Sequence, residues 1–294
     1  MTFRFSNQAV KTINYSIYGV VTFWGLFSSS PTEFYSIWFE LFLYLEMYVL
    51  SMSGVMMIIG QIFGERIQVN KHWELSAIMK EIIGTSQCFY FVAFLATFPV
   101  LKYRKGEEIG ITLDFDEATN MVDNIILKYI FLIVKQIFIW LAAAGWTYLK
   151  HYSLHRPSLF AFHKHHHSCY NPTAFAAFCV TPVHTIWTFC TVIVFCWAEL
   201  PGGKLYYPFQ VVSMFGFLIQ NLYMHCGYTI SVIERTLPYV YINTSAYHNV
   251  HHEKTHTNLG EVSPFWDYVF GTYDKPKYLK AKKKFNWTFY DFSS

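Results

Sequence analysis

Residues 168–233 read SCYNPTAFAAFCVTPVHTIWTFCTVIVFCWAELPGGKLYYPFQVVSMFGFLIQNLYMHCGYTISVI, two long apolar runs joined by the polar segment Glu199–Lys204. Within that segment Pro201, Gly202 and Gly203 interrupt a helix and favour a tight turn. Each run is long enough to cross a bilayer, which takes about 20 mostly apolar residues. The stretch therefore predicts a membrane hairpin that begins and ends on the same face of the membrane.

The rest of the chain holds further apolar segments of membrane-spanning length. The best of them are Leu41–Phe63, Ile82–Leu101 and Ile125–Leu149, whereas Thr12–Thr32 is polar at both ends. Hydrophobic residues make up 53% of the chain and charged residues only 14%, against about 25% charged residues in an average soluble domain. We therefore expect an all-α integral membrane protein with four to six transmembrane helices.

The chain divides into two parts by content. Residues 1–124 hold the first membrane segments and a connecting loop, and residues 125–294 hold the hairpin and every histidine except His72. The formal net charge of +3 is too small to indicate a nucleic-acid partner. Near the C-terminus lysines gather, and both a solvated tail and a tail lying against anionic lipid headgroups explain them: Lys275, Lys277, Lys280, Lys282, Lys283 and Lys284.

Most of the 13 histidines stand in clusters at helical spacing. Residues at positions i, i+3 and i+4 fall on one face of a helix, so we expect each cluster to present its imidazoles to a single point. A further histidine, His225, ends the hairpin. The clusters are an HxxxH (His151, His155), an HxxHH (His163, His166, His167) and a second HxxHH (His248, His251, His252).

The hairpin brings these clusters to one side of the membrane. Residues 151–167 precede it and residues 234–294 follow it, so both stretches lie on the face where the hairpin begins and ends. Lys150, Arg156 and Lys164 lie on that face too, and an excess of lysine and arginine marks the cytosolic side. The sequence therefore predicts a helical, histidine-rich cap on the cytosolic face.

Eight or nine converging imidazoles are too many for one metal ion and suit two. Neutral imidazole binds iron, zinc, copper and nickel, but structural zinc sites take four ligands and often include cysteine. A membrane site made of histidines alone favours two iron ions, which activate dioxygen for attack on a lipid C–H bond. A structural role for the metal is the alternative.

The other histidines receive separate interpretations. His184 lies inside a predicted membrane helix, where an ionisable group is costly and usually functional. It either reaches the metal site or forms a hydrogen bond within the helix bundle, and both interpretations stay open. We expect His165 and His256 beside the site or in solvent, and His72 at the surface.

The order of these motifs resembles the fatty acid hydroxylase/sterol desaturase superfamily of membrane di-iron proteins. The resemblance rests on HxxxH, HxxHH, hairpin and HxxHH, followed by Asn258-Leu-Gly260 and by Phe265-Trp-Asp-Tyr-Val-Phe-Gly-Thr272. It covers roughly residues 125–285. The branch that it is most similar to is the sterol C4-methyl oxidases, which share the pattern around His225-Cys-Gly-Tyr228.

The resemblance implies a function. Members hydroxylate, desaturate or demethylate sterols or fatty acyl lipids in the endoplasmic reticulum membrane, with O2 as co-substrate and electrons from NAD(P)H through an external cytochrome b5-type carrier. Trp266 and Asp267 match a signature that is structural rather than catalytic. The residues that the resemblance assigns as ligands of two iron ions are His151, His155, His163, His166, His167, His225, His248, His251 and His252.

Some positions depart from the family pattern. Thr181 replaces a histidine before Pro182, and Asn249 replaces an aspartate within the third cluster. An alternative function is therefore a catalytically silent accessory subunit of a larger membrane complex that retains the fold and a structural metal site. Because residues 1–32 contain Arg4 and Lys11 but no acid, the mitochondrial inner membrane is the alternative location.

Overall fold

The structure is a computed structural model that describes residues 4–69, 72–197 and 202–276. Three of its helices are long and apolar enough to cross a membrane: α2 (Pro31–Phe63), α3 (Leu75–Arg104) and α5 (Ile125–Leu154). Aliphatic side chains along α5, such as Ile130, Ile133 and Ile137, are about half exposed, as expected of side chains that face lipid. The prediction of a mostly helical protein with long apolar helices is confirmed.

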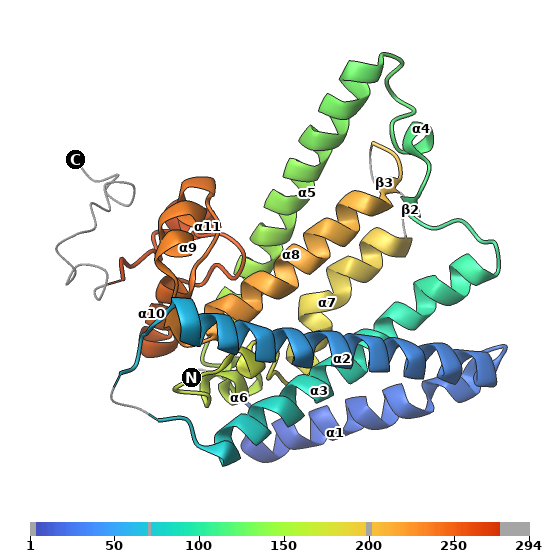
Figure 1. The fold of residues 1–294 in the computed structure, drawn as a ribbon. Coiled ribbons are helices and arrows are strands. Elements are labelled where there is room, and N and C mark those ends of the chain that lie inside the picture. Colours follow the sequence, from blue (N-terminus) through green and yellow to red (C-terminus); the bar gives the residue numbers. More distant parts are fainter. Residues whose placement is uncertain (1–3, 70–71, 198–201, 277–294) are drawn as a thin grey trace.

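The first three helices lie side by side (Figure 1): α1 (Asn7–Trp24), α2 and α3. Between them packs an aromatic cluster that includes the buried Phe34, Trp38 and Phe91. The indole of Trp38 donates to the carbonyl of Tyr90 at 3.0 Å. This hydrogen bond satisfies the one polar atom of Trp38 inside an apolar contact. A short 3-10 turn, η1 (Gly25–Phe27), joins α1 to α2.

A second set of helices rises away from the first (Figure 1): α5, α7 (Pro182–Trp197) and α8 (Tyr207–His225). The ring centroids of Phe189 in α7 and Phe217 in α8 lie 6.5 Å apart. The ammonium of Lys135 in α5 holds the turn between α7 and α8. It donates to the carbonyls of Gly202, Gly203 and Lys204 at 2.6 to 2.9 Å. Residues 199–201 of the predicted turn lie outside the described residues.

The two arms of the hairpin are shorter than the apolar runs that predicted them. Residues 168–181 are not part of a membrane helix: they form the 3-10 turn η3 (Ala174–Ala176) and extended chain. This segment packs against α3, where Glu81 accepts a hydrogen bond from Thr173 at 2.5 Å. Hydropathy detects apolar residues but does not separate those buried in protein from those facing lipid. The second apolar run extends to Ile233, but α8 ends at His225, because apolar residues after it are also buried in protein.

The histidine-bearing elements gather at the end of the molecule where α5 and α8 finish (Figure 1). Two pairs of short strands hold the connections: β1 (Glu65–Arg66) pairs antiparallel with β4 (Tyr228–Thr229), and β2 (Ile111–Thr112) pairs parallel with β3 (Leu205–Tyr206). The β1–β4 pair ties the α2–α3 connection to this end. The remaining helices are η2 (Phe160–Phe162), α4 (Phe115–Ala118), α6 (Lys164–His167), α9 (Ser231–Thr236), η4 (Leu237–Val240), α10 (Ser245–Lys254) and α11 (Phe265–Phe270).

Candidate metal centre

Nine histidines meet in two groups, each of which could hold one metal ion. Within each group the nitrogen atoms lie within 4.8 Å of one another. The nine are the same nine that the sequence singles out. The first group contains His151, His155, His163, His167 and His251, and the second contains His166, His225, His248 and His252.

The sequence predicts that each cluster presents its imidazoles to a single point. This prediction is wrong for the two HxxHH clusters, whose members divide between the two groups. The i, i+4 pairs stay together, because residues four apart differ by only about 40° around a helix. The i+3 member lies on the other side of residue i, about 100° from the i+4 member. Thus His166 leaves His163 and His167, and His251 leaves His248 and His252. Each HxxHH therefore serves both groups.

The elements that carry the rings come from distant parts of the chain. His151 lies in the last turn of α5 and His155 is its C-cap. His163 precedes the single turn of α6, His225 is the last residue of α8, and α10 carries the third cluster. Only the tertiary structure brings these elements to one place.

The Nε2 atoms within each group are spaced like ligands of a common ion. In the first group, Nε2 of His151 lies 2.9 Å from that of His163, and Nε2 of His167 lies 3.2 Å from that of His251. In the second, Nε2 of His225 lies 3.0 Å from that of His248. Nitrogen ligands about 2.1 Å from an ion and at right angles to each other are about 3.0 Å apart. The donor sets therefore fit bound metal.

Hydrogen bonds on the outer side of two rings show which ring nitrogen carries the proton and which one presents a lone pair to the group. Nδ1 of His151 donates to the carbonyl of Leu259 at 2.7 Å, and Nδ1 of His251 donates to that of Thr257 at 2.8 Å. A carbonyl oxygen only accepts, so in the neutral rings the proton is on Nδ1 and Nε2 presents a lone pair. Lone pairs that point at one another repel, and a shared cation removes the repulsion.

Burial keeps these rings neutral. Loss of solvation lowers the pKa of His163, His166, His248 and His252 well below the usual value, and the neighbouring imidazoles lower it further. The same causes lower the pKa of His155 to about 2. Metal binding requires neutral imidazole, so the site is prepared for a cation at ordinary pH.

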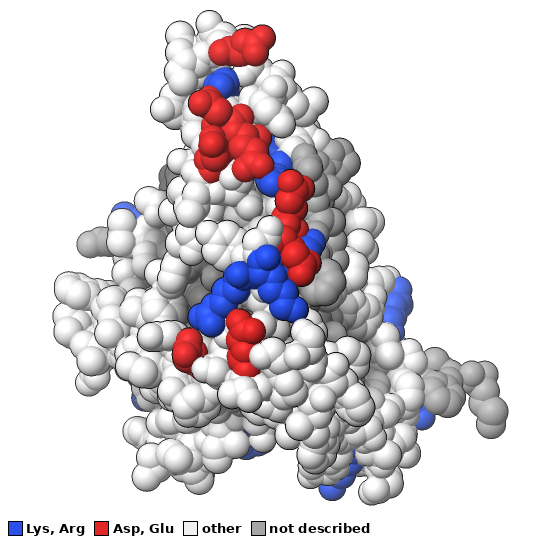
Figure 2. Space-filling view, turned by 90° about the vertical axis from the view of Figure 1, so that its right-hand side faces the viewer, with Lys and Arg blue, Asp and Glu red and all other residues white. Residues whose placement is uncertain are grey.

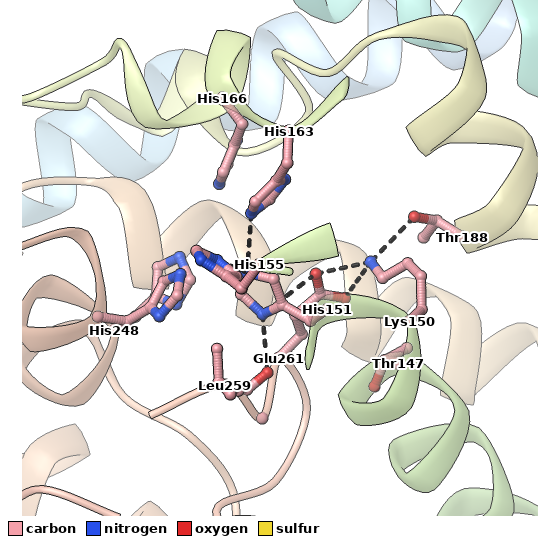
Figure 3. Close-up of polar contacts among 12 residues, drawn as sticks. Thr147, Lys150, His151, His155, His163, His166, Thr188, His248, Leu259 and Glu261 are labelled. Atoms are coloured by element: carbon pink, nitrogen blue, oxygen red, sulfur yellow. Dashed lines mark hydrogen bonds and ion pairs between the residues drawn. The ribbon is translucent and has the colours of Figure 1, made fainter. Parts of the chain in front are cut away.

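A tenth histidine contacts a member of the first group. Nδ1 of His184, near the start of α7, lies 3.2 Å from Nδ1 of His163. Its Nε2 lies 3.2 Å from the ammonium of Lys150. That ammonium also donates to Glu261 at 2.6 Å (Figure 3). Of the two interpretations left open for His184, the structure supports contact with the site, although as the neighbour of a group member rather than as a member.

Lys150 and Glu261 were missed as site residues by the sequence analysis. Lys150 was counted there as a marker of the cytosolic face, but its side chain is 1% exposed, so it does not carry that argument. Arg156 and Lys164 are exposed as expected. The signal for Lys150 was present, since a lysine inside an apolar run and directly before HxxxH calls for a buried anion.

The remaining histidines and Asp267 lie outside both groups. Nε2 of His165 lies 3.4 Å from the thiol of Cys179, while His72 and His256 are exposed. Asp267 is fully buried and accepts from the backbone N–H of Leu259 and Gly260 at 2.7 and 2.8 Å. It thus holds the loop whose carbonyl contacts His151.

A small cavity of about 30 Å³ lies beside the second group. That volume holds a water molecule or two. Its lining combines polar and apolar side chains, among them Lys150, His184, Thr188, Glu261, three second-group histidines (His166, His225, His248), Phe178, Phe189 and Phe217.

Comparison with known proteins identifies similar sequences. Residues 136–272 match the fatty acid hydroxylase family. A methylsterol monooxygenase of Aspergillus fumigatus is 29% identical over 147 residues, 47% of each chain. A Delta(7)-sterol 5(6)-desaturase of the same fungus is 28% identical over 44% of this chain and 36% of its own. A cholesterol 25-hydroxylase-like protein of Danio rerio is 28% identical over 42% and 43%. The chain thus spans less than half the length of these relatives, and no solved structure gave a significant match.

Proposed function

We propose that the protein is a membrane-bound di-iron oxygenase, because residues 136–272 match the fatty acid hydroxylase family. It oxidises a C–H bond of a lipid, by hydroxylation, desaturation or demethylation of a sterol or fatty acyl chain. The observation that carries this proposal is the pair of histidine groups, whose buried Nε2 atoms converge on two points.

All nine histidines serve as ligands in this proposal, five for one iron ion and four for the other. Neither group contains a thiol or carboxylate, and five nitrogen ligands exceed the four of a structural zinc site. Two bound iron ions supply the power to activate O2 and attack an unactivated C–H bond, which no side chain supplies. The surrounding residues orient the histidine ligands and exclude water from the site.

The lipid approaches from the apolar side of the cavity. The apolar lining there consists of Phe178 before α7, Phe189 in α7 and Phe217 in α8. A volume of about 30 Å³ is far below the roughly 300 Å³ of a typical ligand site. The phenylalanine rings therefore rotate aside when a lipid chain enters, and their return excludes water from the reacting carbon.

The proposed topology places the histidine cap on the cytosolic face. Helices α2, α3 and α5, the α7–α8 pair and α1 give four to six crossings. Acidic residues gather on the connection from α3 to α5, beside α4 and the start of α5 (Figure 2). The α5 helix has 30 residues, so this acidic end lies about 45 Å from the cap. Exposed Arg156 and Lys164 at the cap favour the cytosolic side.

Location and partners follow from the same proposal. A multi-pass protein of the endoplasmic reticulum membrane receives its electrons from NAD(P)H through an external cytochrome b5-type carrier that docks on the cap. The mitochondrial inner membrane is the alternative location. Residues 125–294 form the di-iron domain and residues 1–124 the membrane segments that support it.

Two measurements test the function. The protein purified from membranes should contain close to two iron ions per chain, and zinc or no metal would contradict the oxygenase. Cells that lack the gene should accumulate a more methylated or more saturated lipid. An unchanged lipid profile together with bound metal would instead favour the accessory subunit of a membrane complex.

A further inference from the structure

A second cavity, of about 310 Å³, opens at one end of the bundle formed by α1, α2 and α3. Its lining comes from the end of α1, from Ser28–Ser30, from the first turn of α2 and from the end of α3. These helix ends lie on the right of Figure 1, away from the histidine groups. Ligand sites typically measure about 300–1,000 Å³, so the cavity is large enough to hold a small ligand or a lipid headgroup.

This bundle-end cavity is separate from the metal centre. Near the cap, Glu81 of α3 accepts a hydrogen bond from Thr173, whereas Lys102 of the same helix lines the cavity. The helix rises about 30 Å between these two residues. A molecule in the cavity is therefore out of reach of the histidines. In the topology proposed above, the cavity lies at the membrane surface opposite the cap.

The way in which α3 ends brings three charged side chains to the cavity. The N–H of Gly106 donates to the carbonyl of Tyr103 at 2.9 Å, and that of Glu107 donates to the carbonyl of Lys102 at 3.1 Å. This pair of hydrogen bonds is a Schellman motif. It requires a left-handed residue, and Gly106 has a φ of +72°, which glycine adopts without strain. The chain turns back there, so that Glu107 lines the same cavity as Lys102 and Lys105.

Polar groups of the lining have unused hydrogen-bonding capacity. Among the described residues, the ammonium of Lys102 has no partner, and that of Lys105 donates only to the hydroxyl of Ser29, at 3.2 Å. An ammonium group has three N–H donors. The hydroxyl oxygen of Ser28 is buried and also lacks a partner, although buried polar atoms are normally paired. Two cations and a free hydroxyl on one cavity indicate a ligand with several acceptor oxygens, such as a phosphate group.

Aromatic rings in the same lining indicate that the ligand is amphipathic. Trp24, Phe34 and Phe98 line the cavity. The ring centroids of Phe34 and Phe98 lie 5.5 Å apart, and those of Trp24 and Phe98 lie 6.4 Å apart. A free phosphate ion gains nothing from apolar surface, whereas the carbon atoms of a lipid are stabilised by leaving water. A phospholipid therefore fits the lining better than inorganic phosphate does.

We propose that the bundle-end cavity binds the headgroup of a zwitterionic phospholipid. Lys102 and Lys105 donate to the phosphate oxygens, as charged donors do most strongly, and Glu107 pairs with the ammonium of the headgroup. Figure 2 looks onto this end of the bundle and shows basic side chains gathered between acidic ones. Both charges of a zwitterion therefore meet an opposite charge. The inference rests on the proposed membrane topology and does not depend on iron.

Native mass spectrometry of the full chain tests the site. Wild-type protein, the double variant Lys102→Gln with Lys105→Gln and the control Lys11→Gln are released from nanodiscs that contain equal amounts of phosphatidylethanolamine and phosphatidylglycerol with the same acyl chains. Lys11 is exposed on α1 and lies outside the lining. We expect the wild type and the control to retain one phosphatidylethanolamine per chain. The double variant should bind it at least about 10-fold more weakly, because it loses hydrogen bonds to a charged group.

Two further measurements separate the parts of the ligand. Glu107→Gln should lose the preference for phosphatidylethanolamine over phosphatidylglycerol, and excess inorganic phosphate should leave the lipid bound to the wild type. The proposal would be overturned by a wild type that retains no phosphatidylethanolamine, by equal retention in the double variant, or by displacement of the lipid by phosphate. Iron content should be the same in all variants. Absence of iron from the wild type would contradict the di-iron function and leave the lipid site unaffected.

Discussion

Nε2 of His167 lies 3.2 Å from Nε2 of His251, although 84 residues separate them in the chain. The contact joins α6 to α10 and completes the first histidine group. It is also the place where the two HxxHH motifs exchange members, because His251 leaves its own cluster to reach His167. The following predictions test what this arrangement does.

Removing a first-group ligand should abolish lipid oxidation. In His167→Ala the ion loses one of five nitrogen ligands, and we expect activity to fall by more than the 10–100-fold typical of outer partners. Product formation and iron content should fall together. His256→Ala is the control, since that ring is exposed and outside both groups; equal losses in the two variants would contradict the assignment.

The second ion should leave before the first. Three of the four second-group rings have no outer partner for Nδ1 among the described residues, so they are held less firmly than His151 and His251. Stepwise chelation should therefore release one iron early. In His252→Ala that early step should vanish, whereas in wild-type protein a single release step of both ions would refute the prediction.

Metal-free protein should lose stability as the pH falls below about 6.5. Burial lowers the pKa of His251 to about 4 and that of His155 to about 2, from an ordinary value of 6.5. Between these values the unfolded chain binds more protons than the folded one, so acid favours unfolding. At pH 5 each such ring lowers the free energy of unfolding by about 2 kcal/mol relative to pH 8. Melting temperatures measured from pH 8 to pH 5 should fall steadily; a flat profile would show that the rings are not buried.

Asp267→Ala should destabilise the cap. The carboxylate accepts from Leu259, Gly260 and, at 2.5 Å, the hydroxyl of Tyr247. Hydrogen bonds to a buried charge contribute about 1.5–3 kcal/mol each, so we expect a loss of at least about 3 kcal/mol in the free energy of unfolding. Asp274→Ala is the matched control, because the partly exposed pair of Asp274 with Lys254 contributes about 0–1 kcal/mol. Chemical unfolding of both variants checks the difference.

Filling the cavity should block the substrate but not the metal. In Phe217→Trp the larger ring occupies the space beside the second group, and we expect slower lipid oxidation with two irons still bound. Phe217→Leu should keep the path open. If Phe217→Trp oxidises lipid at the wild-type rate, the lipid reaches the ions by another route.

Several features could be predicted from local sequence because their physical basis is local. The i, i+4 spacing of His151 and His155, or of His163 and His167, places two rings on one side of a helix whatever surrounds it. Long apolar segments such as Pro31–Phe63 form helices because a membrane requires internal backbone hydrogen bonds. The nine clustered histidines and the mostly helical fold with long apolar helices were therefore accessible from sequence.

Only the tertiary structure decided how these parts meet. Which rings of α5, α8 and α10 join His163 and His167, and which join His166, depends on how these helices dock, and no spacing within a motif encodes that. The burial of Lys150 against Glu261 joins residues 111 positions apart, and hydropathy could not show that residues 168–181 pack on α3 rather than in lipid. A sequence thus fixes which rings share a helix side, whereas the packing of helices fixes which ion each ring faces.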